Sequence, residues 1–175
     1  MSRHLVVVDM QRVFADPASS WATPGFAAIV PTVAALARAY APAVTFTRFV
    51  APAEPAGAWR RYYEQWPFAV QPPDAPLWDV VPELAPTGPT VDAPAFSKWG
   101  PELAARVGPA ALLLAGVSTD CCVLSTSVAA ADAGVAVQVV ADACAGVDEA
   151  SHSKTLEILA LYAPLIEIVT SADVL

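Results

Sequence analysis

Five short apolar runs alternate along the chain with longer segments of helical periodicity, and this alternation restricts the possible folds more than any other feature. The runs cover residues 4–8, 43–47, 111–115, 135–140 and 165–169. They are largely apolar without regular alternation, which is typical of strands buried on both faces. The helical segments between them cover residues 26–40, 101–107, 122–133 and 149–162. We therefore expect a parallel sheet with helices on both faces.

The chain has room for one such domain. Its 175 residues can bury one substantial core but are few for two, so we expect residues 1–175 to form a single domain. A further strand is expected around residues 90–92. The predicted fold class is α/β, a three-layer α/β/α domain with a mostly parallel, Rossmann-like sheet of roughly six strands. Such sheets bind ligands where their strands end, which directs attention to the residues just after the apolar runs.

Composition argues against several classes of partner. The net charge is −8 and the largest basic cluster is Arg60-Arg61, so we expect no nucleic acid and no anionic membrane surface as partner. No apolar run approaches the roughly 20 residues that span a bilayer, and the N-terminus does not resemble a secretory signal. Three cysteines, two of them adjacent, suit a reducing compartment. We expect a cytoplasmic protein that acts on a small molecule.

The stretch from residue 49 to 76 departs from the alternating pattern. It is rich in proline and carries a group of aromatic residues, namely Trp59, Tyr62, Tyr63, Trp66 and Phe68. Most of them share one face if residues 58–66 are helical. They either roof the core or form a pocket wall or subunit contact, and the sequence leaves these alternatives open. By analogy with sheet enzymes of this size, we expect a homodimer or homotetramer.

The most specific segment covers residues 116–123, Gly-Val-Ser-Thr-Asp-Cys-Cys-Val, which follows a buried strand and opens a helix. A cysteine in the first helical turn faces free backbone N–H groups and the positive end of the helix dipole, and both favour the thiolate. The same N–H groups can hold an oxyanion. Asp120 or Thr119 can cap the helix. Taken alone, however, Cys122 is more often a small buried hydrophobe.

Two charged residues are expected at the same edge of the sheet. Asp9 ends the first run, where a carboxylate is costly to bury unless it is paired or active, although it can also cap the following turn. Lys98 follows the possible strand at residues 90–92, and a surface position is the commoner one for a lysine. An ammonium between a carboxylate and a thiol would keep both anionic and stabilise a reacting centre.

Together these residues resemble the isochorismatase-like cysteine hydrolases, which include nicotinamidases and N-carbamoylsarcosine amidase. The resemblance covers nearly the whole chain and rests on residues 8–11, Phe14, residues 116–123, Thr126, Ala130 and residues 139–143. It implies that Asp9 is the base, Lys98 the charge partner and Cys122 the nucleophile. It also implies a cis peptide between Val117 and Ser118, which would aim the Ser118 and Cys122 N–H groups into an oxyanion hole.

The resemblance and the aromatic content together define an expected activity. We expect a cysteine-dependent hydrolase that cleaves a C–N bond of a small amide, carbamoyl or ureide substrate through a thioester. The expected substrate is partly apolar, and the candidate substrate-binding residues are Gln11, Phe14, Trp21, Trp99 and Val117. Nicotinamidases carry an Asp and several His after the second strand, whereas residues 45–49 read Thr-Phe-Thr-Arg-Phe. With His4 and His152 as the only histidines, we expect neither metal nor other cofactor and disfavour nicotinamide.

Two rival interpretations remain open at the level of sequence. Ser118, Asp142 and His152 occur in the order of an α/β-hydrolase triad, although residues 116–120 lack the second glycine of a Gly-x-Ser-x-Gly elbow. A non-catalytic binding or assembly module is the other, because the usual lysine position of the family aligns near Ala93. The order of residues cannot decide between these interpretations; the relative positions of the side chains can.

Overall fold

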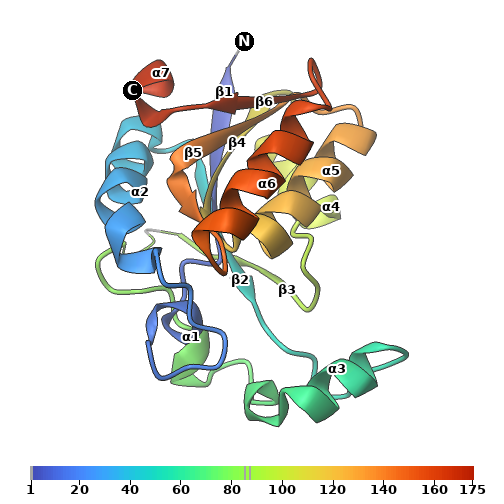
Figure 1. The fold of residues 1–175 in the computed structure, drawn as a ribbon. Helices are drawn as coiled ribbons and strands as arrows, with labels where there is room; N and C mark the ends of the chain where they lie inside the picture. Colours follow the sequence, from blue (N-terminus) through green and yellow to red (C-terminus); the bar gives the residue numbers. More distant parts are fainter. Residues whose placement is uncertain (1, 85, 87) are drawn as a thin grey trace.

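The protein is described by a computed structural model that covers residues 2–84, 86 and 88–175 (Figure 1). Its centre is a single sheet in the order β3-β2-β1-β4-β5-β6, in which all neighbouring strands are parallel. The strands are β1 (Arg3–Val8), β2 (Val44–Phe49), β3 (Val91–Ala93), β4 (Ala111–Val117), β5 (Val137–Ala145) and β6 (Ile166–Val169). The expected six-stranded parallel sheet is therefore confirmed.

Helices cover both faces of the sheet, which confirms the three-layer architecture (Figure 1). One layer contains α2 (Phe26–Tyr40) and α7 (Ser171–Val174), and the other contains α4 (Pro101–Val107), α5 (Leu124–Asp132) and α6 (Glu149–Ala160). Successive side chains of a strand point to opposite faces, so Leu5 and Val7 join one apolar cluster while Val6 and Val8 join the other. All four are fully buried, which explains the uninterrupted apolar character of this run.

The strand order changes direction between β1 and β4, which lie side by side at the centre of the sheet. Val8 pairs with Gly116, so the residues that follow these two strands emerge next to each other. A Cβ atom at Gly116 would stand 2.1 Å from the Val8 carbonyl oxygen, and only glycine permits this approach. The close contact brings the turn after β1 against the turn after β4, at the position where doubly wound sheets bind ligands.

The long connection from β2 to β3 extends beyond the carboxyl end of the sheet (Figure 1). It contains α3 (Trp59–Gln65) and two short 3₁₀ helices, η1 (Pro67–Ala69) and η2 (Pro76–Trp78). The short helix α1 (Arg12–Ala15) lies at the same end of the molecule. Within the described part of the chain, no helix has the length and apolar character needed to cross a membrane.

Candidate active site

Asp9 is the first residue after β1 and is fully buried. Its φ of 49° is unusual for a residue other than glycine and turns the chain sharply at the end of the strand. Thr47 of the neighbouring strand β2 donates its hydroxyl to Asp9 Oδ1 at 2.8 Å and accepts from the Asp9 N–H at 3.3 Å. The strained backbone, the burial and the two hydrogen bonds with Thr47 fix the orientation of the Asp9 carboxylate.

Lys98 lies in the loop after β3 and is buried rather than exposed. Its Nζ atom lies 3.0 Å from Asp9 Oδ2, and both side chains are 0% exposed. The ammonium also donates to the Ala95 carbonyl at 2.7 Å and lies 4.7 Å from the centre of the Phe49 ring. The Lys98 N–H donates to the Thr126 hydroxyl of α5, which anchors the loop. A charge so completely removed from water requires such a partner.

Cys122 lies in a π-helical turn, η3 (Thr119–Val123), that precedes α5. The expected helix over residues 122–133 therefore begins as α5 only at Leu124. Burial raises the pKa of the Cys122 thiol well above its usual value, the Asp9 charge raises it further and Lys98 opposes the shift. This result differs from the thiolate expected at a helix N-terminus, because the cost of burial exceeds the effect of the helix dipole. The direction of this shift favours the thiol over the thiolate.

Two backbone N–H groups at this turn, those of Ser118 and Cys122, are candidate donors to a bound ligand. The Val117–Ser118 peptide is cis, as the resemblance implies. The N–H groups of Cys121 and Val123 both donate to the Ser118 carbonyl at 3.1 Å. Among residues 2–84, 86 and 88–175, no backbone carbonyl accepts from the N–H of Ser118, and none outside η3 accepts from the N–H of Cys122. These two donors belong to residues that line the same cavity.

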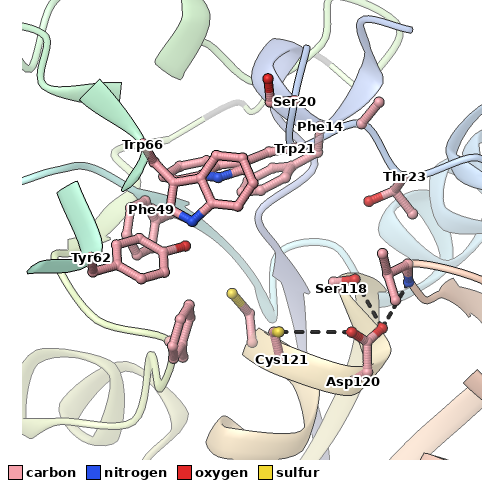
Figure 2. Close-up of a pocket in the computed structure, with 14 residues that line it drawn as sticks. Phe14, Ser20, Trp21, Thr23, Phe49, Tyr62, Trp66, Ser118, Asp120 and Cys121 are labelled. Atoms are coloured by element: carbon pink, nitrogen blue, oxygen red, sulfur yellow. Dashed lines mark hydrogen bonds between the residues drawn. The ribbon is translucent and has the colours of Figure 1, made fainter. Parts of the chain in front are cut away.

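A cavity of about 350 Å³ opens above the turn (Figure 2). Its lining residues are Phe14, Ser20, Trp21, Ala22, Thr23, Phe49, Tyr62, Trp66, Phe96, Ser118, Asp120, Cys121, Cys122 and Val147. Trp21 lies at the centre of the aromatic wall, with ring centroids 5.1 Å from Phe68, 5.9 Å from Tyr62 and 6.2 Å from Phe14. The aromatic residues of the β2–β3 connection thus contribute to a pocket wall, one of the alternatives left open by the sequence.

The candidate substrate-binding residues divide into two groups. Phe14 and Trp21 line the cavity, whereas Gln11, Trp99 and Val117 are not among its lining residues. Gln11 Nε2 donates to the carbonyls of Phe49 and Trp78, both at 2.9 Å, and Oε1 accepts from the Phe49 N–H at 2.8 Å. Its amide therefore ties the end of β2 to η2. Trp99 packs in the apolar cluster that contains Leu103, and Val117 is fully buried at the end of β4.

Several residues of the site carried no clear signal in the sequence. Thr47 holds Asp9, and Phe96 and Asp120 line the cavity. Thr47 could have been found, because the strands expected first and second in the chain are neighbours in most sheets of this class. Phe96 and Asp120 could not, since their orientation depends on loop paths that periodicity does not reveal.

The serine-hydrolase alternative is contradicted by the positions of its three residues. The Ser118 hydroxyl donates to Asp120 at 3.1 Å rather than to a histidine. The His152 Nδ1 is bonded to the Thr119 hydroxyl at 2.9 Å, and Asp142 accepts from the Ser171 N–H at 2.7 Å. Each member has a different partner, so no proton relay connects Ser118 to His152 and Asp142.

The residues at the carboxyl end of β2 do not suit a metal ion. Thr47 is bonded to Asp9, and Arg48 forms an ion pair with Asp92 at 2.6 Å. Within the ranges that the structure describes, no group of three or more His, Cys, Asp or Glu residues is arranged to hold a metal. A hydroxyl already engaged, a guanidinium and an apolar ring offer none of the nitrogen or sulfur ligands that zinc prefers.

Comparisons with known proteins agree with the fold. Solved structures similar to the chain include an isochorismatase family protein from Desulfovibrio vulgaris (TM-score 0.84, 22% identity, 99% of this chain and 96% of that one). Another is a cysteine hydrolase from Pseudomonas syringae (TM-score 0.81, 23% identity, 98% of this chain and 90% of that one). A third is a pyrazinamidase from Pyrococcus horikoshii in complex with zinc (TM-score 0.74, 25% identity, 97% of this chain and 99% of that one). No curated protein sequence gives a significant match. The family model for the isochorismatase domain matches residues 3–173, and the chain therefore belongs to the isochorismatase family of hydrolases.

Proposed function

We propose that the protein is a cysteine-dependent amidohydrolase that cleaves a C–N bond of a small amide, carbamoyl or ureide substrate. The observation that carries this proposal is the fully buried ion pair of Lys98 and Asp9, at 3.0 Å, whose charges both act on the Cys122 thiol. Burying two charges is costly and is often less stabilising than an apolar replacement. A pair retained beside a potential nucleophile therefore favours a catalytic role over a structural one.

Asp9 is the proposed base because one of its oxygens remains available. Oδ1 accepts the Thr47 hydroxyl, whereas Oδ2 contacts Lys98 but accepts no well-directed hydrogen bond from the described residues. In the proposed reaction, Oδ2 takes the thiol proton as the sulfur attacks the carbonyl carbon. The C–N bond then breaks, and the amine leaves with that proton. Water attacks the resulting thioester, releases the acid and returns a proton to the sulfur through Asp9.

The proposed oxyanion hole is formed by the backbone of η3. The N–H of Ser118 donates to no backbone carbonyl of the described chain and the N–H of Cys122 to none outside η3, and both residues line the cavity where a substrate oxygen would lie. Donors placed in advance around a developing negative charge lower the barrier without having to reorganise. Lys98 adds a positive charge close to the thiol and the carboxylate.

A screen for ammonia release from small amides, carbamoyl compounds and ureides tests the proposal. We expect at least one class to be hydrolysed, with a transient thioester at Cys122 detectable by intact-mass measurement after acid quenching. The pyrazinamidase among the similar structures makes carboxamides the first class to test. If no compound is hydrolysed and none acylates Cys122, the remaining alternative, a non-catalytic binding module, becomes the better interpretation.

Asp9→Asn is expected to separate thiol reactivity from catalysis. The Asp9 charge raises the pKa of Cys122, so removing it lowers that pKa and increases the thiolate fraction at neutral pH. Iodoacetamide should therefore alkylate Cys122 roughly tenfold faster in the variant, while amide hydrolysis is lost with the base. Peptide mapping over a pH series measures the rate at each cysteine. The exposed Asp132→Asn is the matched control, and slower alkylation in Asp9→Asn would contradict the proposal.

Hydrolysis is expected to survive exhaustive chelation. The residues at the carboxyl end of β2, Thr47, Arg48 and Phe49, do not offer the nitrogen or sulfur ligands that zinc prefers. Turnover of an identified substrate should be the same before and after dialysis against EDTA. Loss of activity with EDTA and recovery with added zinc, iron or manganese would show that this assignment is wrong.

Two further parts of the proposal concern the setting of the protein. Three unpaired cysteines support a cytoplasmic location. Self-association as a homodimer or homotetramer stays a prediction, which light scattering at micromolar concentration tests. Tyr62 and Trp66 line the cavity. Their apolar surface is therefore used by the cavity, and the segment from Trp59 to Phe68 has less apolar surface available for a subunit interface than the sequence suggested.

A further inference from the structure

The cavity has an unusual distribution of charge. Asp120 is the only charged side chain among its lining residues, and no Lys, Arg or His of the described chain lines it. The nearby Lys98 does not alter this balance, because it is fully buried and paired with Asp9. A substrate entering the cavity therefore meets one carboxylate and no cation.

The Asp120 carboxylate is held in place but keeps acceptor capacity. Its Oδ1 accepts from the Ser118 hydroxyl at 3.1 Å and from the Val147 N–H at 2.8 Å. Its Oδ2 is contacted by the Cys121 thiol at 3.7 Å, which is a weak donor. Asp120 is half-buried, so its carboxylate is only partly hydrated and a cation in the cavity would be a stronger partner than the Cys121 thiol. Oδ2 therefore lacks the strong partner that a bound cation would provide.

The opposite wall presents aromatic rings. Six aromatic residues line the cavity, and Figure 2 shows Trp21, Tyr62 and Trp66 gathered on one side with Asp120 on the other. Aromatic faces carry a partial negative charge and attract cations, Trp most strongly. Burial raises the pKa of Tyr62, so its ring remains a neutral phenol. Both walls thus favour a positive group, and neither favours an anion.

We infer that the substrate carries a cationic group, an ammonium or alkylammonium, bound between Asp120 and the aromatic wall while its amide carbonyl reaches Cys122. This inference rests on the proposed function for the reacting end of the substrate. The protein's net charge of −8 also favours the approach of cations. An anionic substrate would lose its hydration, meet the Asp120 carboxylate and find no cation to replace the lost water.

Three primary amides of matched size test the inference. The first is the amide of γ-(trimethylammonio)butyric acid, the second is its neutral isostere with a tert-butyl group, and the third is the anionic glutaramate. We expect kcat/KM for the cation to exceed that for the isostere by about tenfold and the anion to be the poorest substrate. Equal values for cation and isostere, or a preference for the anion, would overturn the inference.

Asp120→Asn locates the source of the preference. The side-chain oxygen of asparagine can still accept from Ser118 and Val147, so the turn keeps its hydrogen bonds while the charge is removed. We expect the ratio of kcat/KM for cation to isostere to fall severalfold toward one. Asp132→Asn, at an exposed position outside the cavity, should leave the ratio unchanged. An unchanged ratio in Asp120→Asn would contradict the assigned role of Asp120.

Binding to a Cys122→Ser variant keeps this inference separate from the proposed function. Calorimetric titration with the same three amides measures affinity without any reaction. We expect the cation to bind about tenfold more tightly than the isostere. If wild-type protein hydrolyses none of the amides but the variant binds them in this order, cysteine-dependent cleavage of these amides fails and the charge preference stands. If the isostere is hydrolysed but the cation binds no better, the preference fails and the proposed function stands.

Discussion

Cys122→Ser should lower kcat/KM for an identified substrate by at least about a thousandfold, the largest effect expected of any single substitution. Serine preserves the shape of the side chain, so the 3% exposed position should remain well packed. Its hydroxyl is a weaker nucleophile, and Asp9 would have to remove a more tightly held proton. Ammonia release measures turnover, and circular dichroism with thermal unfolding verifies that the variant is folded.

Cys144→Ala is the matched control for this substitution. Cys144 is also buried, and burial raises its pKa to about 12, but it lies outside the cavity, with its sulfur 4.0 Å from the Leu114 carbonyl. We expect a modest loss of stability and a kcat/KM close to that of the wild type. Wild-type turnover by Cys122→Ser, or an equal loss in both variants, would rule out Cys122 as the nucleophile.

Lys98→Met is expected to reduce turnover by about a hundredfold or more and to lower the free energy of unfolding by about 3–5 kcal/mol. The ammonium lowers the pKa of Cys122, so its loss raises that pKa further and makes the thiol a poorer nucleophile. The loss of stability was not expected from sequence alone. It follows from the complete burial of the pair, because the substitution leaves the Asp9 carboxylate without its counter-charge.

The double variant Asp9→Asn/Lys98→Met distinguishes the two effects. Replacing both partners removes the uncompensated charge, so the free energy of unfolding should recover much of what Lys98→Met loses. Activity should not recover, since neither base nor ammonium is present. Denaturant unfolding and ammonia release measure the two quantities on the same samples. A Lys98→Met variant as stable and as active as the wild type would contradict both the burial and the proposed role of Lys98.

The sequence predicted the sheet well because its strands carry the signal in their own side chains. Continuous apolar runs identify strands buried on both faces, and their order places Asp9 and the Cys122 turn at one edge. The same reasoning could not locate Lys98 with certainty, since the path of its loop depends on the Thr126 hydrogen bond and on packing against Phe49. The position relative to Asp9 is a tertiary property that strand patterns do not encode.

The state of Cys122 and the role of Gln11 show a second limit. A helix N-terminus suggests a thiolate, but burial, with the Asp9 charge, shifts the pKa of Cys122 in the opposite direction. Gln11 follows a strand on the ligand side, yet its amide is hydrogen-bonded to the backbone of Phe49 in β2 and of Trp78 in η2. In both cases the residue type was informative, whereas its partners, which determine the chemistry, were known only from the structure.

The aromatic wall and the proposed reacting groups come from different parts of the chain, and this separation bears on how the protein can diverge. Tyr62 and Trp66 belong to the β2–β3 connection, whereas Asp9 directly follows β1 and Cys122 lies in the turn that follows β4. Loops tolerate substitution and changes in length far better than the packed strands beneath them. Selection can therefore reshape what enters the cavity by altering one surface segment, while the groups beneath it remain fixed.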